Sequence, residues 1–574
     1  MRGSGLRHLI PYARPYYGLL FRGTVYACIG AAASAFSPVL LGRAVDALRA
    51  GVRLDLLAIY AVGLIALSAT LAFFRYRLRM LSGTIAVGVT YQMGADLFAR
   101  LLVLDQKTLQ SYGTGDLLSR GTSDFIYIWR FFSAGFQMSA HALFLLGIGC
   151  TLMALTSPLL AAIVLIMLIV SVGAQISLGR GVELAFENVQ RELARLSAFA
   201  QEHLNAARTL TAYSQERAAI KAFAQVSDAY ALENMRYVLH ANAVTPIPAM
   251  VVRLAATLVL AIGGVLIIQE RLTIGQYVQF IVYLGLLSTA ATQLSRAIER
   301  LQQGSAAAGR VGDVLIRHPA VADPPDAVRP ELRGELRLEN VSVKLGDQWV
   351  LRDIDLHVPV GQTIGIVGLT GAGKSTLLSL LVRARDPGRG RILIDGHDIR
   401  QIMLDTLRRA VGYVPQETLL FSLPLRENVN FGGEDISDEA IHAALLASRL
   451  ANDLPQLPQG LDTLVGERGA TLSGGQKQRT AIARALLREP RMLLLDDSLS
   501  SVDAHTASEI LRELRTVRGG RTCLIVAQRM AAVRDADRII VLEDGRIVEQ
   551  GDHHELMALD GRYAAMVRRE TSEE

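Results

Sequence analysis

Two glycine-rich motifs carry the side chains best suited to chemistry in this 574-residue chain. Residues 368–375 read G-L-T-G-A-G-K-S and directly follow the apolar run Thr363 to Val367. A strand, a glycine loop and a helix in that order form a cradle in which backbone N–H groups, a lysine and a hydroxyl hold phosphates and Mg²⁺. The sequence therefore predicts a nucleotide site. Its predicted binding residues are Gly368, Leu369, Thr370, Gly371, Ala372, Gly373, Lys374, Ser375 and Thr376.

A carboxylate is expected to reach this site from a second strand. The apolar run Met492 to Leu495 ends in Asp496, and upstream of it the chain reads L-S-G-G-Q at 472–476. A carboxylate at the carboxyl end of a strand beside a phosphate loop holds Mg²⁺ in ATPases of this kind. Asp496 and Ser375 are therefore predicted metal ligands, and ATP and Mg²⁺ are the predicted cofactors.

These motifs lie in the second half of the chain, whereas the first half is strongly apolar. The whole chain is 51% hydrophobic, and its mean hydropathy is +0.30. Crossing a bilayer takes about 20 mostly apolar residues, because lipid offers the backbone no hydrogen-bond partners. Six stretches meet this requirement: 17–41, 56–74, 131–155, 159–178, 249–268 and 277–294.

The distribution of arginine predicts the orientation of these spans. The long loops at 75–130 and 180–245 are rich in arginine, and cytoplasmic loops carry such an excess. Both loops and both termini are therefore predicted to be cytoplasmic, although Arg49 and Arg53 lie in a loop on the other side. The segment before Tyr16 is interrupted by arginine and proline. This composition favours an amphipathic helix on the membrane surface over a cleavable signal.

The predicted fold is an all-α transmembrane domain of six helices with long cytoplasmic extensions, followed by an α/β P-loop ATPase domain with a helical subdomain. The two domains are expected at 1–302 and 335–574. The segment 303–334 between them contains Gly304 and four prolines, which is typical of a linker. Three cysteines without C-x-x-C spacing indicate neither a disulfide framework nor a zinc site. The net charge of +5 fits arginines that flank membrane helices better than nucleic-acid binding.

Three polar residues within the predicted spans stand out, namely Arg253, Gln137 and His141. Arg253 lies in the fifth span shortly after Pro246 and Pro248, and a charge at that depth is costly unless it faces water or a partner. Two interpretations of Arg253 stay open: it lines a substrate cavity, or it reaches lipid headgroups from near the cytoplasmic end. For Gln137 and His141 in the third span, helix-to-helix hydrogen bonding is expected.

Taken together, these features resemble an ABC half-transporter of the exporter type over nearly the whole chain. The resemblance rests on a set of motifs, namely Walker A at 368–375, a glutamine loop at Gln416, a signature at 472–476, Walker B at 492–496, a D-loop at 500–503 and an exporter-like V-G-E-R-G at 465–469.

The resemblance implies that two ATPase domains pair head-to-tail, with each ATP between one domain's Walker A and the other's signature. Further nucleotide-binding residues would then be Ser473, Gly474, Gly475, Gln476 and Asp503. Gln416 would join Ser375 and Asp496 at the metal. Short helices near 105–120 and 206–216 would carry motion to the membrane.

Three positions depart from the hydrolytic set that the resemblance implies, and all three serve one ATP. Asp497 stands where glutamate is expected, Gln528 replaces the switch histidine, and Leu345 replaces the adenine-stacking aromatic, for which Trp349 is a possible substitute. A misplacement of about 1 Å can cost around 100-fold in rate, and an amide cannot share charge as imidazole does. Asp497, Gln528 and Gln416 are therefore the predicted catalytic residues of a site that binds ATP and hydrolyses it poorly.

The intact signature favours a partner that differs from this chain. A signature serves only the ATP held by the opposite domain, so the expected partner is a second, non-identical half-transporter that supplies glutamate and histidine. The expected function is ATP-driven export of amphipathic drugs, lipids or peptides across a bacterial cytoplasmic membrane. The chain is expected to be multi-pass, to contact membrane lipids and to bind no nucleic acid.

Three alternatives stay open. The first is a homodimeric exporter or lipid flippase in which Asp497 acts slowly as base, because two-fold homodimers are the commonest assemblies. The second is a regulatory ATP-binding subunit with little turnover. The third, a soluble P-loop enzyme tethered to the membrane, would need fewer spans and no L-S-G-G-Q.

Overall fold

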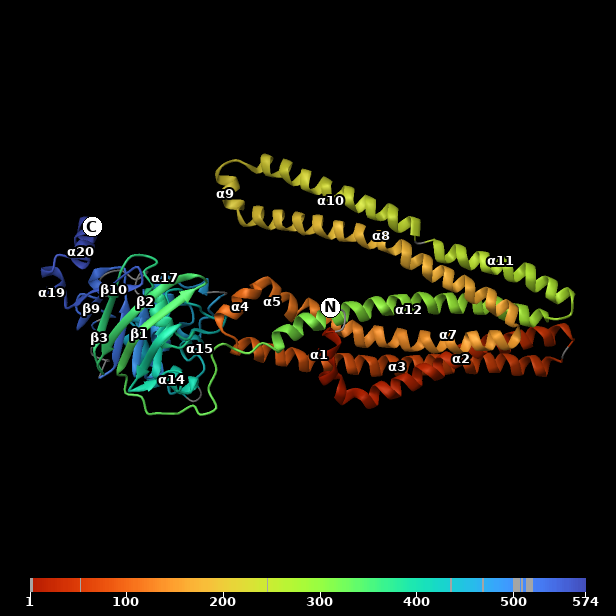
Figure 1. Cartoon of the computed structure of the whole chain (residues 1–574), viewed down its shortest axis with the longest axis horizontal. Coiled ribbons are helices and arrows are strands. Elements are labelled where there is room, and N and C mark those ends of the chain that lie inside the picture. The colour runs from red at the N-terminus through yellow and green to blue at the C-terminus, as the bar shows by residue number, and fades with distance from the viewer. Residues whose placement is uncertain are drawn as a thin grey trace. The chain divides into compact units, whose positions relative to one another are not determined.

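The computed structural model describes residues 4–51, 53–244, 246–433, 436–466, 469–498, 506, 509–510, 512 and 520–573. Tertiary contacts divide the chain into two units: Met1–Leu102 with Tyr112–Arg317, and Val103–Ser111 with His318–Glu574. The first unit is helical, and the second combines β-sheets with helices (Figure 1). This arrangement confirms the predicted fold class.

Among the described residues, six helical stretches are long and apolar enough to cross a bilayer, and each contains one predicted span. The stretches are Gly5–Arg49, Leu54–Val103, Thr114–Thr156, Pro158–Asn205, Glu216–Ile268 and Ile274–Leu315. Their elements are α1 (Ser4–Ala13), η1 (Arg14–Tyr16), α2 (Tyr17–Arg49), α3 (Leu54–Val103), α5 (Thr114–Gly121), α6 (Ser123–Arg130), η2 (Phe131–Gly135), α7 (Phe136–Thr156), α8 (Pro158–Asn205), α10 (Glu216–Val244), α11 (Ile247–Ile268) and α12 (Ile274–Leu315). At 42 to 53 residues each, the stretches extend well beyond the roughly 20 residues that a bilayer requires.

Close backbone contacts join α2 to α12. A Cβ on Gly42 would lie 2.6 Å from the carbonyl oxygen of Gly275, so the two helices approach where neither carries a side chain. The carboxylate of Asp46 accepts hydrogen bonds from Thr273 Oγ1 (2.6 Å) and from the Gly275 N–H (2.7 Å). The hydroxyl of Tyr283 donates to the carbonyl of Ala35 (2.6 Å). These contacts hold the second half of α2 against the beginning of α12.

The polar residues predicted within the spans have different surroundings. In the described part of the chain, His141 Nε2 is buried without a hydrogen-bond partner, so this atom does not make the expected interhelical bond. Such a bond does join α12 to α7, from Gln279 Nε2 to Thr156 Oγ1 (3.2 Å). Arg253 is exposed on α11, and both interpretations of its role stay open.

The last membrane helix is longer than the sequence indicated. α12 continues to Leu315, so residues 303–315 of the segment expected to be a linker are helical, and the irregular segment covers 316–335. The physical reason is the role of Gly304, which allows a close contact and does not break the helix. A Cβ there would lie 2.5 Å from Phe131 Cβ, and Ala307, Ala308 and Val311 beyond it are fully buried.

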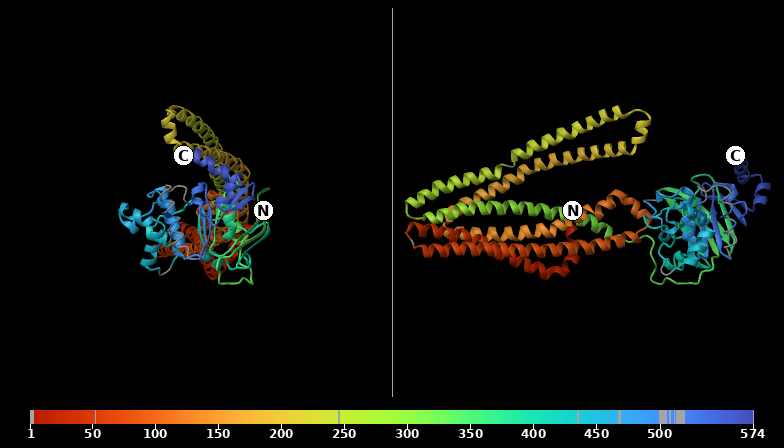
Figure 2. Two further views of the ribbon diagram at one scale, coloured as in Figure 1. Left: turned by 90° about the vertical axis from the view of Figure 1, so that its left-hand side faces the viewer. Right: turned by 180° about the vertical axis from the view of Figure 1, so that it is seen from behind.

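A hairpin formed by α8, α9 (Ala207–Ala212) and α10 diverges from α7 and α12 (Figures 1 and 2). α8 and α10 pack along each other, yet none of the described residues of α10 is buried. Large apolar side chains, including Ile220, Met235 and Leu239, are more than half exposed. Short helices occur at both predicted tips, as α4 (Gln106–Tyr112) and α9.

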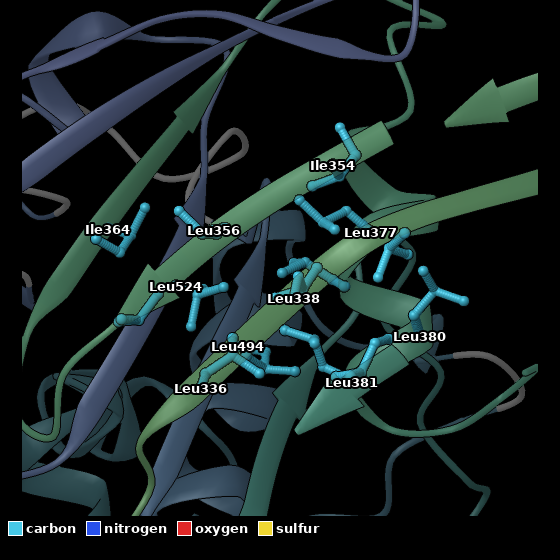
Figure 3. Packing of buried hydrophobic residues seen from close by; sticks show 14 of the residues in the cluster. Leu336, Leu338, Ile354, Leu356, Ile364, Leu377, Leu380, Leu381, Leu494 and Leu524 are labelled. Carbon is cyan, nitrogen blue, oxygen red and sulfur yellow. The ribbon is translucent and has the colours of Figure 1, made fainter. Parts of the chain in front are cut away.

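The second unit contains two sheets. A four-stranded sheet has the order β2-β1-β4-β5, and a six-stranded sheet has the order β10-β9-β3-β8-β7-β6. The strands are β1 (Leu336–Leu345), β2 (Gln348–Val358), β3 (Thr363–Val367), β4 (Arg389–Ile394), β5 (His397–Asp398), β6 (Val411–Val414), β7 (Met492–Asp496), β8 (Thr522–Val526), β9 (Arg538–Glu543) and β10 (Arg546–Gly551). Figure 3 shows leucine and isoleucine side chains of both sheets packed with Leu377, Leu380 and Leu381 of α13 (Lys374–Leu381).

A helical subdomain lies between β6 and β7 in the chain and has its own apolar core. Its elements are α15 (Leu425–Val429), α16 (Asp438–Ala447), η3 (Leu450–Gln456), η4 (Gly460–Asp462) and α17 (Gly474–Leu487). Arg479 of α17 donates two hydrogen bonds to the largely buried carboxylate of Asp453 (2.8 and 2.9 Å), which fixes α17 within the subdomain. Within the described residues, the other helices are α14 (Leu404–Ala410), η6 (Met530–Ala532), α19 (His553–Ala558) and α20 (Arg562–Glu573).

Candidate functional site

The glycine loop joins the fully buried strand β3 to α13. Gly368 and Gly373 have φ angles of +153° and +101°, a region that residues with a Cβ rarely adopt. A Cβ on Gly368 would lie 2.2 Å from the Leu542 carbonyl oxygen, and one on Gly373 would lie 2.8 Å from Leu351 Cδ2. Both positions therefore require glycine for conformation and for space.

The charged and hydroxyl groups predicted around the loop contact one another. Lys374 Nζ donates to the carbonyl oxygens of Gly368 (2.7 Å) and Leu369 (3.0 Å). Ser375 Oγ donates to Asp496 Oδ1 (2.9 Å). The structure thus brings together two of the three predicted metal ligands, Ser375 and Asp496, while the side chain of the third, Gln416, contacts Asp497. The rest of the predicted set, Thr370, Gly371, Ala372 and Thr376, lies on the loop or in the first turn of α13.

The topology of the six-stranded sheet brings four distant segments to one edge. β3, β6, β7 and β8 are all parallel, so their carboxyl ends meet at the same edge. The glycine loop follows β3, Gln416 follows β6, Asp496 ends β7 and Gln528 follows β8. Sequence alone placed the glycine loop and Asp496 at strand ends, and the strand order brings Gln416 and Gln528 to the same edge.

Asp497 is held by residues from two of these segments. Gln416 Nε2 donates to Asp497 Oδ2 (3.3 Å), and the backbone N–H of Gln528 also donates to this carboxylate. The Asp497 N–H donates to the carbonyl of Val526 (3.0 Å). The φ angle of Asp497 is +46°, a left-handed conformation that aspartate tolerates better than most residues. Of the three predicted catalytic residues, Gln416 and Gln528 therefore each contact Asp497.

Burial governs the electrostatics of this edge. It raises the pKa of the Asp496 carboxyl, against the opposing effect of hydrogen bonds from Ser375 and Tyr413 and the charge of Lys374. Burial likewise raises the pKa of Asp497, although hydrogen bonds from Gln528 and Gln416 oppose it, and it lowers the pKa of the Lys374 ammonium. Two poorly solvated carboxylates beside one lysine favour the binding of a further cation.

The donor set fits Mg²⁺. A hydroxyl oxygen of Ser375 and a carboxylate oxygen of Asp496 lie within hydrogen-bond distance, and Mg²⁺ prefers oxygen ligands from one or two carboxylates completed by phosphates and water. No cluster of three or more His, Cys, Asp or Glu side chains suited to a metal occurs in the described ranges. A metal held mainly by protein carboxylates, as in a calcium cage, therefore does not fit these residues.

Tyr413 is a residue of the site that the sequence analysis did not identify. Its hydroxyl lies 3.4 Å from Asp496 Oδ2, and burial raises its pKa above the ordinary value for tyrosine. The tyrosine is therefore protonated and can donate to the carboxylate. A signal was present, because Tyr413 lies near the carboxyl end of the strand that leads to Gln416.

The signature forms a separate structure. Ser473 is the N-cap of α17, where its hydroxyl accepts from the Gln476 N–H while the Gln476 side chain accepts from the Ser473 N–H. Ser473 and Gly474 are exposed. Within the described residues, no hydrogen bond joins this motif to the glycine loop. The predicted nucleotide ligand Asp503, with the rest of 500–503, lies outside the described residues, as do 467–468 of V-G-E-R-G.

The predicted adenine position has no aromatic ring. Leu345 is 43% exposed at the turn between β1 and β2. Two cationic side chains lie over the Trp349 ring: Lys344 Nζ is 4.7 Å and Arg389 Cζ is 5.3 Å from the ring centroid. These cations come from β1 and β4, whereas Gly373 of the glycine loop faces Val350 and Leu351. The contacts favour an interaction of Trp349 with its own sheet over stacking on adenine.

Comparisons with known proteins agree with this geometry. The model of the ABC transporter transmembrane region matches residues 20–291, and the model described as ABC transporter matches residues 351–500. The probable multidrug resistance ABC transporter ATP-binding/permease protein YheI of Bacillus subtilis is 34% identical over 93% of this chain and 92% of its own length. The ATP-dependent lipid A-core flippase of Chromohalobacter salexigens is 30% identical over 98% and 97%.

A solved structure of similar fold extends the comparison. A bacterial Atm1-family ABC exporter with ATP bound superposes with a TM-score of 0.83 at 28% identity, over 96% of this chain and 98% of that one. The chain therefore belongs to the ABC transporter family, as an exporter-type half-transporter with membrane and ATPase domains in one polypeptide. It is a multi-pass membrane protein whose ATPase domain is cytoplasmic and is coupled to transport.

Proposed function

We propose that this chain is one half of a two-chain ATP-driven exporter of amphipathic molecules, in which its own Walker site binds ATP and Mg²⁺ but hydrolyses ATP poorly. In this proposal the transmembrane domain ends with α12, and the ATPase domain begins at Glu335, directly before β1. The partner is a second, non-identical half-transporter, and the complex lies in a bacterial cytoplasmic membrane.

The arrangement around Asp497 carries the proposal. Hydrolysis forms a bond from water to the γ-phosphorus and breaks the bond to the bridging oxygen, so a carboxylate must orient that water or accept its proton. The aspartate side chain is one methylene shorter than glutamate, and Gln416 and Gln528 already hold its carboxylate. A carboxylate held back from the γ-phosphate supports nucleotide binding with slow chemistry.

The binding functions of the site are retained in the proposal. Backbone N–H groups of the glycine loop and Lys374 hold the phosphates, while Ser375 and Asp496 hold Mg²⁺, which neutralises phosphate charge. The amide of Gln528 contacts the γ-phosphate without sharing its charge. The intact cap at Ser473 presents the exposed signature to ATP on the partner, where glutamate and histidine perform the hydrolysis.

The uncovered hairpin supports a two-chain assembly. α10 presents Ile220, Met235 and Leu239 to the exterior, and apolar side chains on a cytoplasmic extension are stabilised by burial. A second half-transporter with the same architecture supplies a helical surface of matching length. This support applies equally to identical and non-identical partners, so the non-identity of the partner rests on Asp497, Gln528 and Ser473.

Amphipathic cargo is the substrate class that the family supports. The relatives named above are called a multidrug resistance transporter and a lipid flippase, and drugs and lipids share an apolar body with a polar end. We therefore include lipids, amphipathic drugs and apolar peptides in the proposed range.

Steady-state ATPase measurements test the proposal. The chain is purified alone in lipid nanodiscs and, separately, in the native complex with the proteins that copurify with it, identified by mass spectrometry. We expect little phosphate release from the chain alone, nucleotide binding in both samples, and rapid release from a complex that contains a second half-transporter. Rapid hydrolysis by the chain as a pure homodimer would contradict the degenerate site, and slow hydrolysis by every complex would favour a regulatory subunit.

A further inference from the structure

The last helix of the chain contacts the turn that carries Gln528. The carboxylate of Glu570 on α20 accepts a hydrogen bond from the backbone N–H of Met530 (2.7 Å), two residues after Gln528. Met530 begins η6, so this carboxylate satisfies a free amide at the start of a helical turn. A hydrogen bond that involves a charged group is stronger than a neutral one.

The same turn is anchored on its other side by the nucleotide site. The N–H of Gln528 donates to the carboxylate of Asp497, and the Ala527 N–H donates to the carbonyl of Ile366 (3.3 Å). The segment 527–530 is therefore fixed by Asp497 at one end and by Glu570 at the other. Although its backbone N–H is held in this way, the Gln528 residue is exposed.

α20 is itself held firmly enough to serve as an anchor. Tyr563 at its start is fully buried and belongs to the same apolar core as Ala527 and Met530. Its N–H donates to the carboxylate of Glu549 (3.0 Å), and its hydroxyl contacts His553 Nδ1 (2.8 Å). The position of Glu570 thus follows from packing at the other end of the helix.

We propose that Glu570 is a positioning residue for the switch glutamine, so that the C-terminal helix sets where the Gln528 amide stands relative to the γ-phosphate. This inference rests on the proposed function, which assigns Gln528 to the γ-phosphate. Glu570 lies outside the nucleotide-binding motifs. Loss of its carboxylate should therefore leave the phosphate loop intact and release only the segment 527–530, which carries Gln528.

Two measurements on the full-length chain in lipid nanodiscs test this role. The first is amide hydrogen exchange across 527–534 without nucleotide, where Glu570→Ala should accelerate exchange by about tenfold to hundredfold, as expected for the loss of a charge-assisted hydrogen bond. The second is affinity for ATPγS and for ADP. Glu570→Ala should weaken ATPγS binding by about threefold to tenfold and leave ADP binding unchanged, because ADP lacks the γ-phosphate.

Matched variants separate positioning from general stability. Glu570→Gln keeps an acceptor oxygen at the same distance and should restore most of both effects. Arg568→Ala on the same helix removes only an exposed ion pair with Asp560 and should behave as wild type. If Glu570→Ala matches Arg568→Ala in exchange and in ATPγS affinity, the inference is wrong. It is also wrong if ADP binding falls as much as ATPγS binding.

The Gln528→Ala variant distinguishes the two proposals. If it leaves ATPγS affinity unchanged, the assignment of Gln528 to the γ-phosphate fails, and with it this part of the proposed function. If it lowers ATPγS affinity while Glu570→Ala does not, the assignment stands and the role of Glu570 is rejected.

Discussion

The side-chain amide of Gln416 donates a hydrogen bond to the carboxylate of Asp497 across 3.3 Å. The contact links the end of β6 to the end of β7, two of the four strands whose carboxyl ends meet at the site. Gln416 thereby orients the Asp497 carboxylate along the edge of the sheet. The reach of this acid, and therefore its access to an attacking water, depends on side-chain length.

The first prediction concerns the length of the acidic side chain at position 497. Asp497→Glu combined with Gln528→His should raise ATP hydrolysis by the isolated chain about tenfold to hundredfold, because the carboxylate and the γ-phosphate contact move to productive positions. Phosphate release in nanodiscs measures the effect. Asp497→Asn with Gln528→Asn is the control and should remain at background. A double variant no faster than wild type would show that geometry is not the limitation.

The second prediction separates the two halves of the site. In the native complex, Lys374→Ala should weaken nucleotide binding at this chain and leave residual turnover, since the hydrolysing site lies on the partner. Ser473→Arg should abolish nearly all turnover. Ser437 is a matched control, because its hydroxyl also accepts from the third backbone N–H of a helix, α16, away from the signature, and losing either cap costs about 1 kcal/mol. Turnover that survives Ser473→Arg but falls with Ser437→Arg would reject the proposed division of labour.

The third prediction concerns pH. Burial lowers the pKa of the Lys374 ammonium, so the group loses its charge at a lower pH than an ordinary lysine does. Phosphate binding needs the charged form, and ATPγS affinity should therefore begin to fall earlier as the pH rises into the alkaline range. Lys374→Arg keeps its charge throughout this range and should show a flatter profile. Equal profiles for the lysine and arginine forms would contradict the role of this titration.

The fourth prediction tests packing in α12. Gly304→Ala places a Cβ 2.5 Å from Phe131 Cβ, and such overpacking typically costs about 1–3 kcal/mol. Gly285→Ala on the same helix meets no atom within 4 Å and should be neutral or slightly stabilising. Thermal unfolding in one detergent compares the two variants. Equal melting temperatures would show that Gly304 tolerates a side chain.

Much of this architecture follows from sequence because its signals are local. Six apolar runs and the G-x-x-x-x-G-K-S loop each report on a single element, so the spans and the order of the motifs were predictable. The local signal at Gly304 is ambiguous, since glycine marks both chain breaks and close helix contacts, and only the position of Phe131 distinguishes them. The contacts of Tyr413 and Glu570 depend on strand order and helix docking, which no local pattern encodes.

The backbone at Asp497 illustrates the same limit. Its substitution for glutamate was visible in the sequence, but its φ of +46° and its contact with Gln416 follow from how β6, β7 and β8 pair. Sequence therefore indicated which residue is unusual, and the structure gives the reason why its reach is restricted.

The uninterrupted course of α12 has a mechanical consequence. At 42 residues and about 1.5 Å per residue, the helix is roughly 63 Å long, about twice the thickness of the hydrocarbon layer. A rod of this length acts as a lever: tilting it by about 5° displaces its far tip by roughly 5 Å. A hinge at 303 would have absorbed this displacement, whereas a continuous helix transmits it to its far end.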